Sequence, residues 1–162
     1  MARLKKKWKI LGAIVIVIVA PIAWWLLSPL FIDRTVEEEF PKAGTASAVR
    51  KIRTGAFRDG DSFHKGSGQV AIHRLGDGSA VLRMEDFKGT NGPDLHVYLA
   101  SHPNPQEKSD VVDGGFVNLG RLKGNIGSQN YPIAKDVDIS KQKSVVIWCK
   151  AFSVIFSVAS LK

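Results

Sequence analysis

The sequence predicts an all-β domain, an antiparallel β-sandwich or barrel of about eight to ten strands, preceded by one N-terminal transmembrane helix. Three observations support this prediction. Short apolar runs separated by turn residues follow one another beyond residue 50, no helical period is sustained after residue 33, and residues 10–32 carry no charge. Once those first 32 of the 162 residues are set aside, the chain has the length of one ordinary domain.

Residues 10–32 form the expected membrane span. These 23 uncharged residues would make a helix of roughly 34 Å, enough to cross a hydrocarbon core of about 30 Å. Five basic residues precede the span and acidic residues follow it, so the positive-inside rule places residues 1–9 in the cytoplasm. We therefore expect a single-pass protein of the cell membrane with an extracytoplasmic C-terminal domain.

A cleaved secretory signal is the competing interpretation of this start. Against it, Trp24 and Trp25 continue the apolar run, and Ala20 is followed by proline, which leaves no good cleavage site. The pattern favours a retained anchor. The residues after it, 33–49, are acidic and then small and polar, which is typical of a linker, and residues 50–162 would form the β domain.

A β-hairpin is the clearest local signal in the domain. Strand-like runs at 69–74 and 80–84 flank the turn sequence Gly-Asp-Gly-Ser at 76–79. Further runs follow at similar spacing, most of them divided by glycine-rich turns: 94–99, 116–119, 129–133, 144–150 and 154–161. This series predicts the sandwich or barrel.

The charge of the chain does not indicate a nucleic-acid binder. The formal net charge is +8, but five of the 23 basic residues precede the membrane span. Residues 10–162 keep 18 basic against 15 acidic side chains, which is too weak an excess for a phosphate-binding stripe. We expect no nucleic-acid partner.

The single cysteine, Cys149, decides which chemistry the chain can use. It cannot close a disulfide within the chain, and one thiol excludes four-cysteine iron–sulfur centres and covalent haem attachment through paired cysteines. A blue-copper site fails too, because all four histidines lie at least 47 positions before Cys149 and no His or Met follows it. No phosphate loop, nucleophile elbow or acid–base pair is legible, so we expect no metal centre and no stand-alone enzyme, although an enzyme on a small substrate is a third hypothesis.

Five segments resemble, in order and at fitting spacing, the DM-thirteen domain, also called the electron-transfer DM-thirteen family. The resemblance runs from about residue 50 to residue 161. The matching segments are 61–68 (DSFHKGSG), 81–87 (VLRMEDF), 91–99 (NGPDLHVYL), 119–131 (LGRLKGNIGSQNY) and the Trp148-Cys149 block.

The resemblance implies an extracytoplasmic, predominantly β domain that takes part in electron transfer. It implies that Cys149 acts as a bare redox thiol or as a ligand to a prosthetic group such as haem. The chain looks like a membrane-anchored, bacterial-type, single-domain member. Its expected partners are the membrane and a redox or cell-surface protein.

The residues also allow a structural interpretation. In a strand, Val145, Ile147 and Cys149 share one face, so the thiol could be core packing in a non-catalytic binding or adhesion module. His64 lies in a turn-rich segment and is either a cofactor-binding residue near Cys149 or a residue that holds its loop.

Other polar residues are assigned to surfaces and turns. His96 and Tyr98 are expected on the wetter face of their strand, and Asp94 at a turn, accepting backbone N–H bonds. A further group is expected to form a polar surface, with a small binding groove as the alternative: Lys123, Asn125, Gln129, Asn130 and Tyr131.

Overall fold

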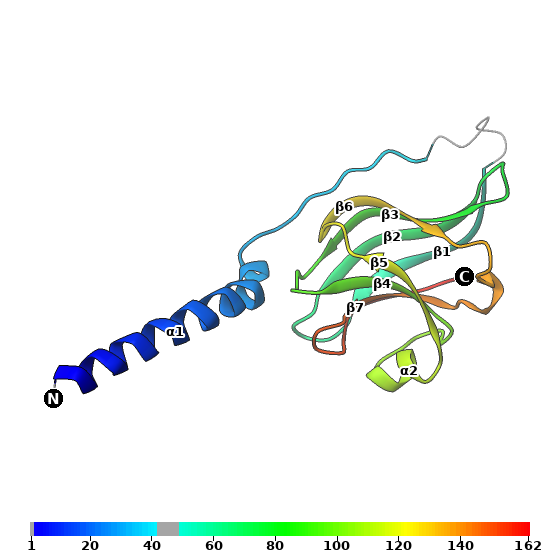
Figure 1. The fold of residues 1–162 in the computed structure, drawn as a ribbon. Helices are drawn as coiled ribbons and strands as arrows, with labels where there is room; N and C mark the ends of the chain where they lie inside the picture. Colours follow the sequence, from blue (N-terminus) through cyan, green and yellow to red (C-terminus); the bar gives the residue numbers. More distant parts are fainter. Residues whose placement is uncertain (1, 42–48) are drawn as a thin grey trace.

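The computed structural model describes residues 2–41 and 49–162, with side chains in these ranges except at 2–7, 9–12 and 30. The chain begins with helix α1 (Ala2–Leu27) and a 3-10 turn, η1 (Ser28–Leu30), and continues into a β domain (Figure 1). The strands are β1 (Arg50–Asp59), β2 (Gly66–Arg74), β3 (Ala80–Gly89), β4 (Leu95–Ala100), β5 (Phe116–Arg121), β6 (Ile126–Ile133), β7 (Ser144–Cys149) and β8 (Val154–Ser160). Two short helices lie between strands, α2 (Lys108–Val112) and η3 (Ile139–Lys141).

The eight strands form one antiparallel sheet in the order β5-β4-β7-β8-β1-β2-β3-β6. Strand β1 joins its two halves, because residues 50–56 pair with β2 and residues 57–59 pair with β8. The outermost strands, β5 and β6, are consecutive in the chain and close the sheet into a nearly complete barrel (Figure 1). The predicted all-β antiparallel architecture and the 76–79 hairpin are confirmed.

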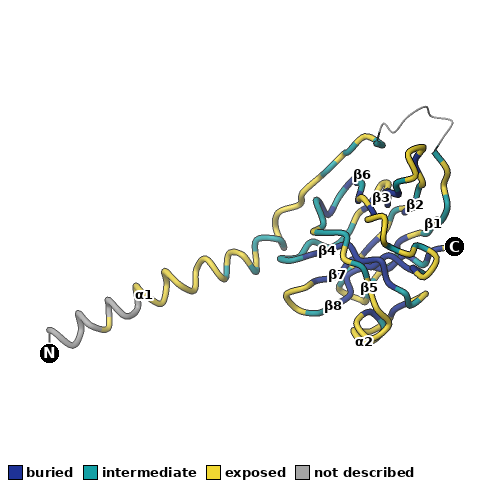
Figure 2. Tube along the Cα trace, turned by 45° about the vertical axis from the view of Figure 1, so that its right-hand side comes forward, coloured by how far each residue is buried: buried dark blue, intermediate teal, exposed yellow. Residues whose placement is uncertain are grey.

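Side chains on one face of each strand point inward and fill the barrel. On β7, Val145, Ile147 and Cys149 face the core, and each is at most 1% exposed. Strand β1 escapes sequence detection because its side chains alternate weakly: of its residues only Phe57 is buried. Strands β4 and β7, which are buried along their whole length, are dark blue in Figure 2.

The outer face of β4 and β7 is covered rather than wet. Tyr98 and Trp148 pack there with Val111 of α2, and Tyr98 is only 3% exposed. The expectation that His96 and Tyr98 lie on a wetter face is therefore wrong, since His96 is also buried. The cause is the connection between β4 and β5, which carries α2 and folds back over the strands.

The segment that the sequence predicts as a linker follows the edge of β6. Thr35 forms a parallel bridge with Ile126, and the N–H groups of Val36 and Glu38 donate to the carbonyls of Ile126 and Ser128 at 2.9 and 2.8 Å. We call residues 33–41 the strap. It ties the entry of the domain to a strand about ninety positions later.

Helix α1 extends away from the barrel (Figure 1), and its apolar side chains from Ile14 to Leu27 are largely exposed (Figure 2). Over the side chains described, none of the helices is both long enough and apolar enough to span a bilayer. The span over residues 10–32 stays a prediction.

Candidate functional site

Cys149 is a core residue in this structure. It ends β7, lies opposite Leu95 of β4 and Val154 of β8, and its exposed fraction is 0%. A free thiol in such surroundings packs as a small hydrophobe and is shielded from reagents. Lys150, the next residue, is exposed and lies outside the core.

His64 lies in the loop between β1 and β2, where Asp61 organises the backbone. One oxygen of Asp61 accepts the N–H groups of Phe63 and His64, each at 2.7 Å, and its other oxygen lies 2.7 Å from Nδ1 of His64. The side-chain bond to His64, followed by the His64 N–H, lowers the pKa of Asp61 to about 2. The carboxylate therefore stays ionised at neutral pH and fixes both the loop and the imidazole.

The imidazole of His64 is also held by an aromatic contact. Its ring lies 4.0 Å from the ring of Phe156, with an interplanar angle of 40°. When Nδ1 carries the proton that it donates to Asp61, Nε2 presents a lone pair, the arrangement found in metal-ligating histidines. Asp61, three residues before His64 and next to Gly60, is a pattern from which this Asx turn could have been predicted.

An apolar pocket of about 490 Å³ opens beside His64. Its wall comes from the end of α1, the His64 loop, the turn before β4 and the β7–β8 hairpin. Gly92 allows the Phe156 ring to pack directly against the turn before β4, because a Cβ there would meet that ring at 3.0 Å. The lining residues are Leu26, Pro29, Phe63, His64, Thr90, Asn91, Gly92, Pro93, Phe152, Val154 and Phe156.

Cys149 is near this pocket but is not one of its lining residues. Val154 lines the pocket and is the cross-strand partner of Cys149, and Phe156 belongs to the same core cluster as the thiol. The structure thus brings His64 and Cys149 to the same end of the barrel, with the thiol behind the pocket wall.

The pocket fits a planar prosthetic group, and His64 is better placed than Cys149 to be the ligand of that group. The volume lies in the range of small-molecule sites, the walls are mostly apolar, and one imidazole is pre-oriented by a carboxylate. Cys149 does not fit as a ligand in this conformation, because its side chain is fully buried. Among the described residues, no three His, Cys, Asp or Glu side chains cluster as a metal site.

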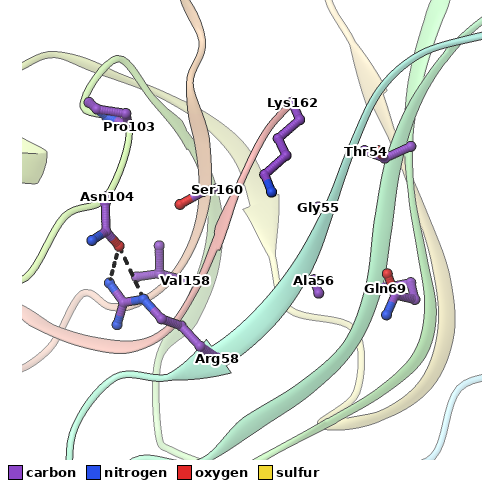
Figure 3. A pocket seen from close by; sticks show the side chains of 10 residues that line it. All are labelled: Thr54, Gly55, Ala56, Arg58, Gln69, Pro103, Asn104, Val158, Ser160 and Lys162. Carbon is purple, nitrogen blue, oxygen red and sulfur yellow. Dashed lines mark hydrogen bonds between the residues drawn. The ribbon is translucent and has the colours of Figure 1, made fainter.

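A second pocket, of about 660 Å³, lies over β1 and β8 (Figure 3). Its one arginine, Arg58, is occupied: Nη2 donates to Oδ1 of Asn104 at 2.7 Å and to the carbonyl of Pro105 at 2.8 Å. These bonds hold the loop after β4 on the barrel, and we assign the pocket a structural role.

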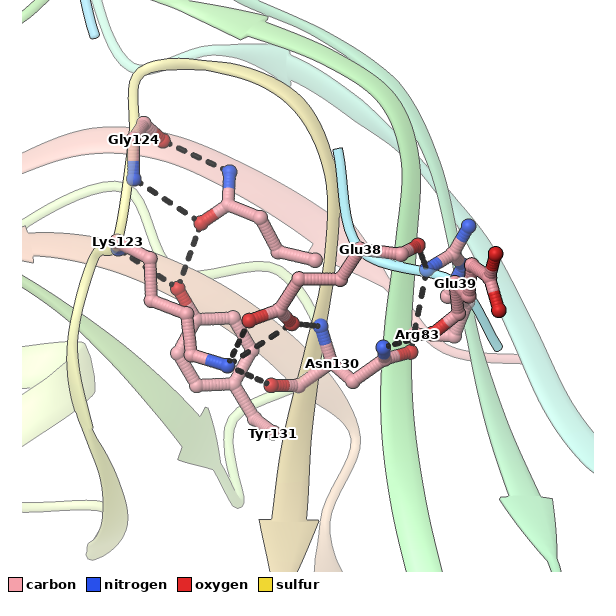
Figure 4. Close-up of polar contacts among 8 residues, drawn as sticks. Glu38, Glu39, Arg83, Lys123, Gly124, Asn130 and Tyr131 are labelled. Atoms are coloured by element: carbon pink, nitrogen blue, oxygen red, sulfur yellow. Dashed lines mark hydrogen bonds and ion pairs between the residues drawn. The ribbon is translucent and has the colours of Figure 1, made fainter. Parts of the chain in front are cut away.

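The polar group expected on a surface is instead partly a buried network (Figure 4). The hydroxyl of Tyr131 donates to Oε1 of Gln129 at 2.8 Å and accepts the N–H of Lys123 at 3.0 Å. Gln129 also bonds both backbone groups of Gly124. Gln129, Tyr131 and Asn125 are at most 3% exposed, so the surface expectation is wrong for these three.

Lys123 connects this network to the strap. Its ammonium lies 2.8 and 2.9 Å from the two carboxylate oxygens of Glu38 (Figure 4). Partial burial raises the pKa of Glu38, but the bonds from Lys123 and from the Asn130 N–H outweigh burial and leave the pKa below its usual value. The network holds the β5–β6 loop closed.

Asp94 uses its carboxylate on side chains. Its Oδ1 lies 3.1 Å from Nε2 of His96 and 3.3 Å from Nη2 of Arg121. The expectation that this carboxylate accepts backbone N–H bonds is therefore not met; the backbone carbonyl of Asp94 accepts the N–H of Lys150 instead. Asp94 thus couples His96 to β5.

Comparison with known proteins gives a family match. The family model described as Electron transfer DM13 matches residues 56–161. No curated protein matches the chain, and no solved structure does. The match confirms the family that the sequence motifs indicate, and it covers every strand from the end of β1 to β8.

Proposed function

Because the chain belongs to the Electron transfer DM13 family, we propose that it is a membrane-anchored electron-transfer domain whose redox group sits in the pocket beside His64. One observation carries the proposal. His64 lies on the wall of an apolar pocket with Nδ1 bonded to an ionised carboxylate, and that pairing orients and strengthens imidazole ligands.

Each residue around the pocket has a definite role in this proposal. Nε2 of His64 binds the group, Asp61 fixes the tautomer and the ring direction, and Phe156 supports the ring from one side. Gly92 lets Phe156 pack closely at the pocket wall, and the apolar walls exclude water. A bound haem or similar group would supply reversible one-electron transfer, with a potential set by this ligand and this shielding.

We propose that Cys149 acts on the site from behind Val154, its cross-strand partner on the pocket wall. A thiol in this position places a polarisable sulfur atom behind the pocket wall, next to the proposed redox group. Direct ligation or redox use of Cys149 requires the β7–β8 hairpin to open. The hairpin turn contains Ser153 at φ 55°, a conformation that L residues adopt rarely.

We propose that residues 10–32 anchor the chain, with residues 1–9 in the cytoplasm and the β domain outside. The charge asymmetry supports this orientation. The exposed apolar side chains of α1 support it too, since in water Ile14, Ile16 and Ile18 would each be more than half exposed.

A second candidate is a cell-surface binding module in which Cys149 only packs the core. The burial of Cys149 favours this candidate. The two differ in whether the pocket takes a redox group.

Haemin titration of the full chain in detergent tests the proposal. We expect a ligand-dependent Soret band that His64→Ala abolishes and that His102→Ala, at a partly exposed histidine outside the pocket, leaves unchanged. A chain that gives no band, or a band that survives His64→Ala, would overturn the assignment and favour the binding module. Cys149→Ser reports separately on the thiol, because a shifted band would show its influence on the bound group.

A further inference from the structure

The β domain carries two strongly exposed phenylalanines. Phe63, in the β1–β2 loop, is 83% exposed, and Phe152, in the β7–β8 turn, is 57% exposed. The other exposed large apolar side chains described in the domain, Val112 and Phe116, reach 44% and 42%. Aromatic side chains placed this way on loop tips mark a surface that binds something apolar.

Both phenylalanines lie at the end of the barrel from which α1 extends. They line the same pocket as Leu26 of α1 and Pro29 of η1, and Figure 1 shows the β1–β2 and β7–β8 connections at this end. The final turns of α1 carry two exposed indoles, Trp24 and Trp25, which suit a membrane–water interface. The apolar surface is therefore continuous from the helix to the loops.

The domain is held close to the helix. Asn91 donates to the carbonyl of Ile32 at 2.8 Å, and Asn125 bonds both the N–H of Arg34 and the carboxylate of Asp33 at 2.7 Å. Five residues separate the end of α1 from residue 33, and a segment of that length spans at most about 18 Å. The loops that carry Phe63 and Phe152 therefore stay close to the end of α1.

The charges nearby suit a shallow contact with a lipid surface. Lys150 is exposed next to the β7–β8 turn, and Lys65 is exposed after His64 although it also pairs with Asp59. Ammonium groups beside aromatic tips favour anionic headgroups. Asp61 belongs to the same loop, so only the rings and not the backbone enter the lipid.

We propose that this end of the barrel rests on the outer surface of the membrane that holds α1, with Phe63 and Phe152 inserted at headgroup depth. This inference rests on the proposed anchoring of residues 10–32. It adds that the mouth of the His64 pocket faces the bilayer rather than the bulk solvent.

Nitroxide accessibility in the full chain tests the contact. The chain is reconstituted into vesicles of phosphatidylcholine and phosphatidylglycerol and labelled at Ser62→Cys or Ala151→Cys, next to the two rings. Cys149 is fully buried and does not compete for the label. Lys135→Cys, exposed beside the β2–β3 turn at the other end, is the control. We expect the ratio of oxygen to nickel-chelate collisions to be several-fold higher at 62 and 151 than at 135.

Two further variants make the test specific. Phe63→Ser and Phe152→Ser should bring the ratios at 62 and 151 down to that of the control. If the chain stays with the vesicles after a carbonate wash but the ratios match the control, the contact is refuted while the anchor stands. If the chain washes off, the anchor itself fails. Protection that rises with the protein-to-lipid ratio would instead assign the loops to a second copy.

Discussion

Nδ1 of His64 lies 2.7 Å from Oδ2 of Asp61, while Oδ1 of the same carboxylate accepts two backbone N–H groups. One side chain therefore sets both the loop and the direction of the imidazole. The shape of the β1–β2 loop and the orientation of the imidazole therefore depend on the same side chain. Only a substitution that keeps the turn can separate the two effects.

Asp61→Asn is that substitution. An amide oxygen still accepts from the Phe63 and His64 N–H groups, but the anionic acceptor for Nδ1 is lost. Because such partners typically change the affinity for a histidine-bound metal about 10- to 100-fold, we expect haemin to bind about tenfold more weakly. The far-ultraviolet circular dichroism should not change. Wild-type affinity in Asp61→Asn would show that the carboxylate does not orient a ligand.

The pH dependence of this pair has a defined sign. The folded-state pKa of Asp61, about 2, is below the unfolded value, so its contribution to stability is present above about pH 4 and disappears as the pH falls through 2. The Asp61 carboxyl resonance should titrate with a midpoint near 2. In His64→Ala the midpoint should rise toward the ordinary value, and an unchanged midpoint would contradict the assigned cause.

Cys149 should resist labelling in the folded chain. Its side chain is fully buried between Leu95 and Val154, so a small thiol reagent reacts only when the structure opens. We expect stoichiometric reaction in denaturant and very slow reaction without it. The Ala151→Cys variant provides a reactive reference at an exposed position two residues further along the chain, in the β7–β8 turn. Rapid labelling of the native chain would indicate that the hairpin opens readily.

Tyr131 and Tyr98 allow a controlled test of the buried network, because both are buried but only Tyr131 belongs to it. Tyr131→Phe removes the partner of the Lys123 N–H and of Gln129, and leaving such groups unpaired costs about 1–3 kcal/mol. Burial raises the pKa of Tyr131 to about 12, in keeping with a shielded hydroxyl. Tyr98→Phe removes a hydroxyl without a hydrogen-bond partner in the described structure and should cost less than about 0.5 kcal/mol. Urea unfolding of both variants measures the difference, and equal losses would contradict the network.

Glu38→Gln tests the strap. We expect a loss of about 1 kcal/mol at pH 7, because the charge-assisted bonds to Lys123 are weakened. The lowered pKa of Glu38 means that its contribution is present above the unfolded value and is lost as the pH falls through the folded one. The variant should therefore lose less stability than the wild type on acidification. Asp136→Asn, an exposed carboxylate without such bonds, should be neutral.

The sequence predicts the strands that stand out as short apolar runs between turn residues. The 76–79 hairpin and the later strands are found because buried β-branched residues alternate with turns, as in β7. Strand β1 is missed because its side chains are mostly polar or small: only Phe57 is buried, and Ile52 packs against the core while partly exposed. The cover of α2 over Tyr98 depends on how a loop folds back, which no local pattern encodes.

Residue types in the sequence identify candidate site residues, but they do not predict how those residues are buried or paired. The sequence selects Cys149 and the His64 loop, but the thiol is buried because its face of β7 points into the core that the closed sheet encloses. The buried Gln129 and Tyr131 look like surface residues because amides and hydroxyls are usually exposed. They find partners in each other and in the backbone of Lys123 and Gly124, which the folded β5–β6 loop brings to them.

The strap also fixes an order of events during synthesis. Residues 33–41 leave the ribosome long before β6, whose residues 126–128 they bind. The newly made segment therefore has no partner until β6 has been translated, and closing so large a loop is slow. A defect in β6 would therefore release residues 33–41 and leave the barrel joined to α1 by a segment without its backbone partners.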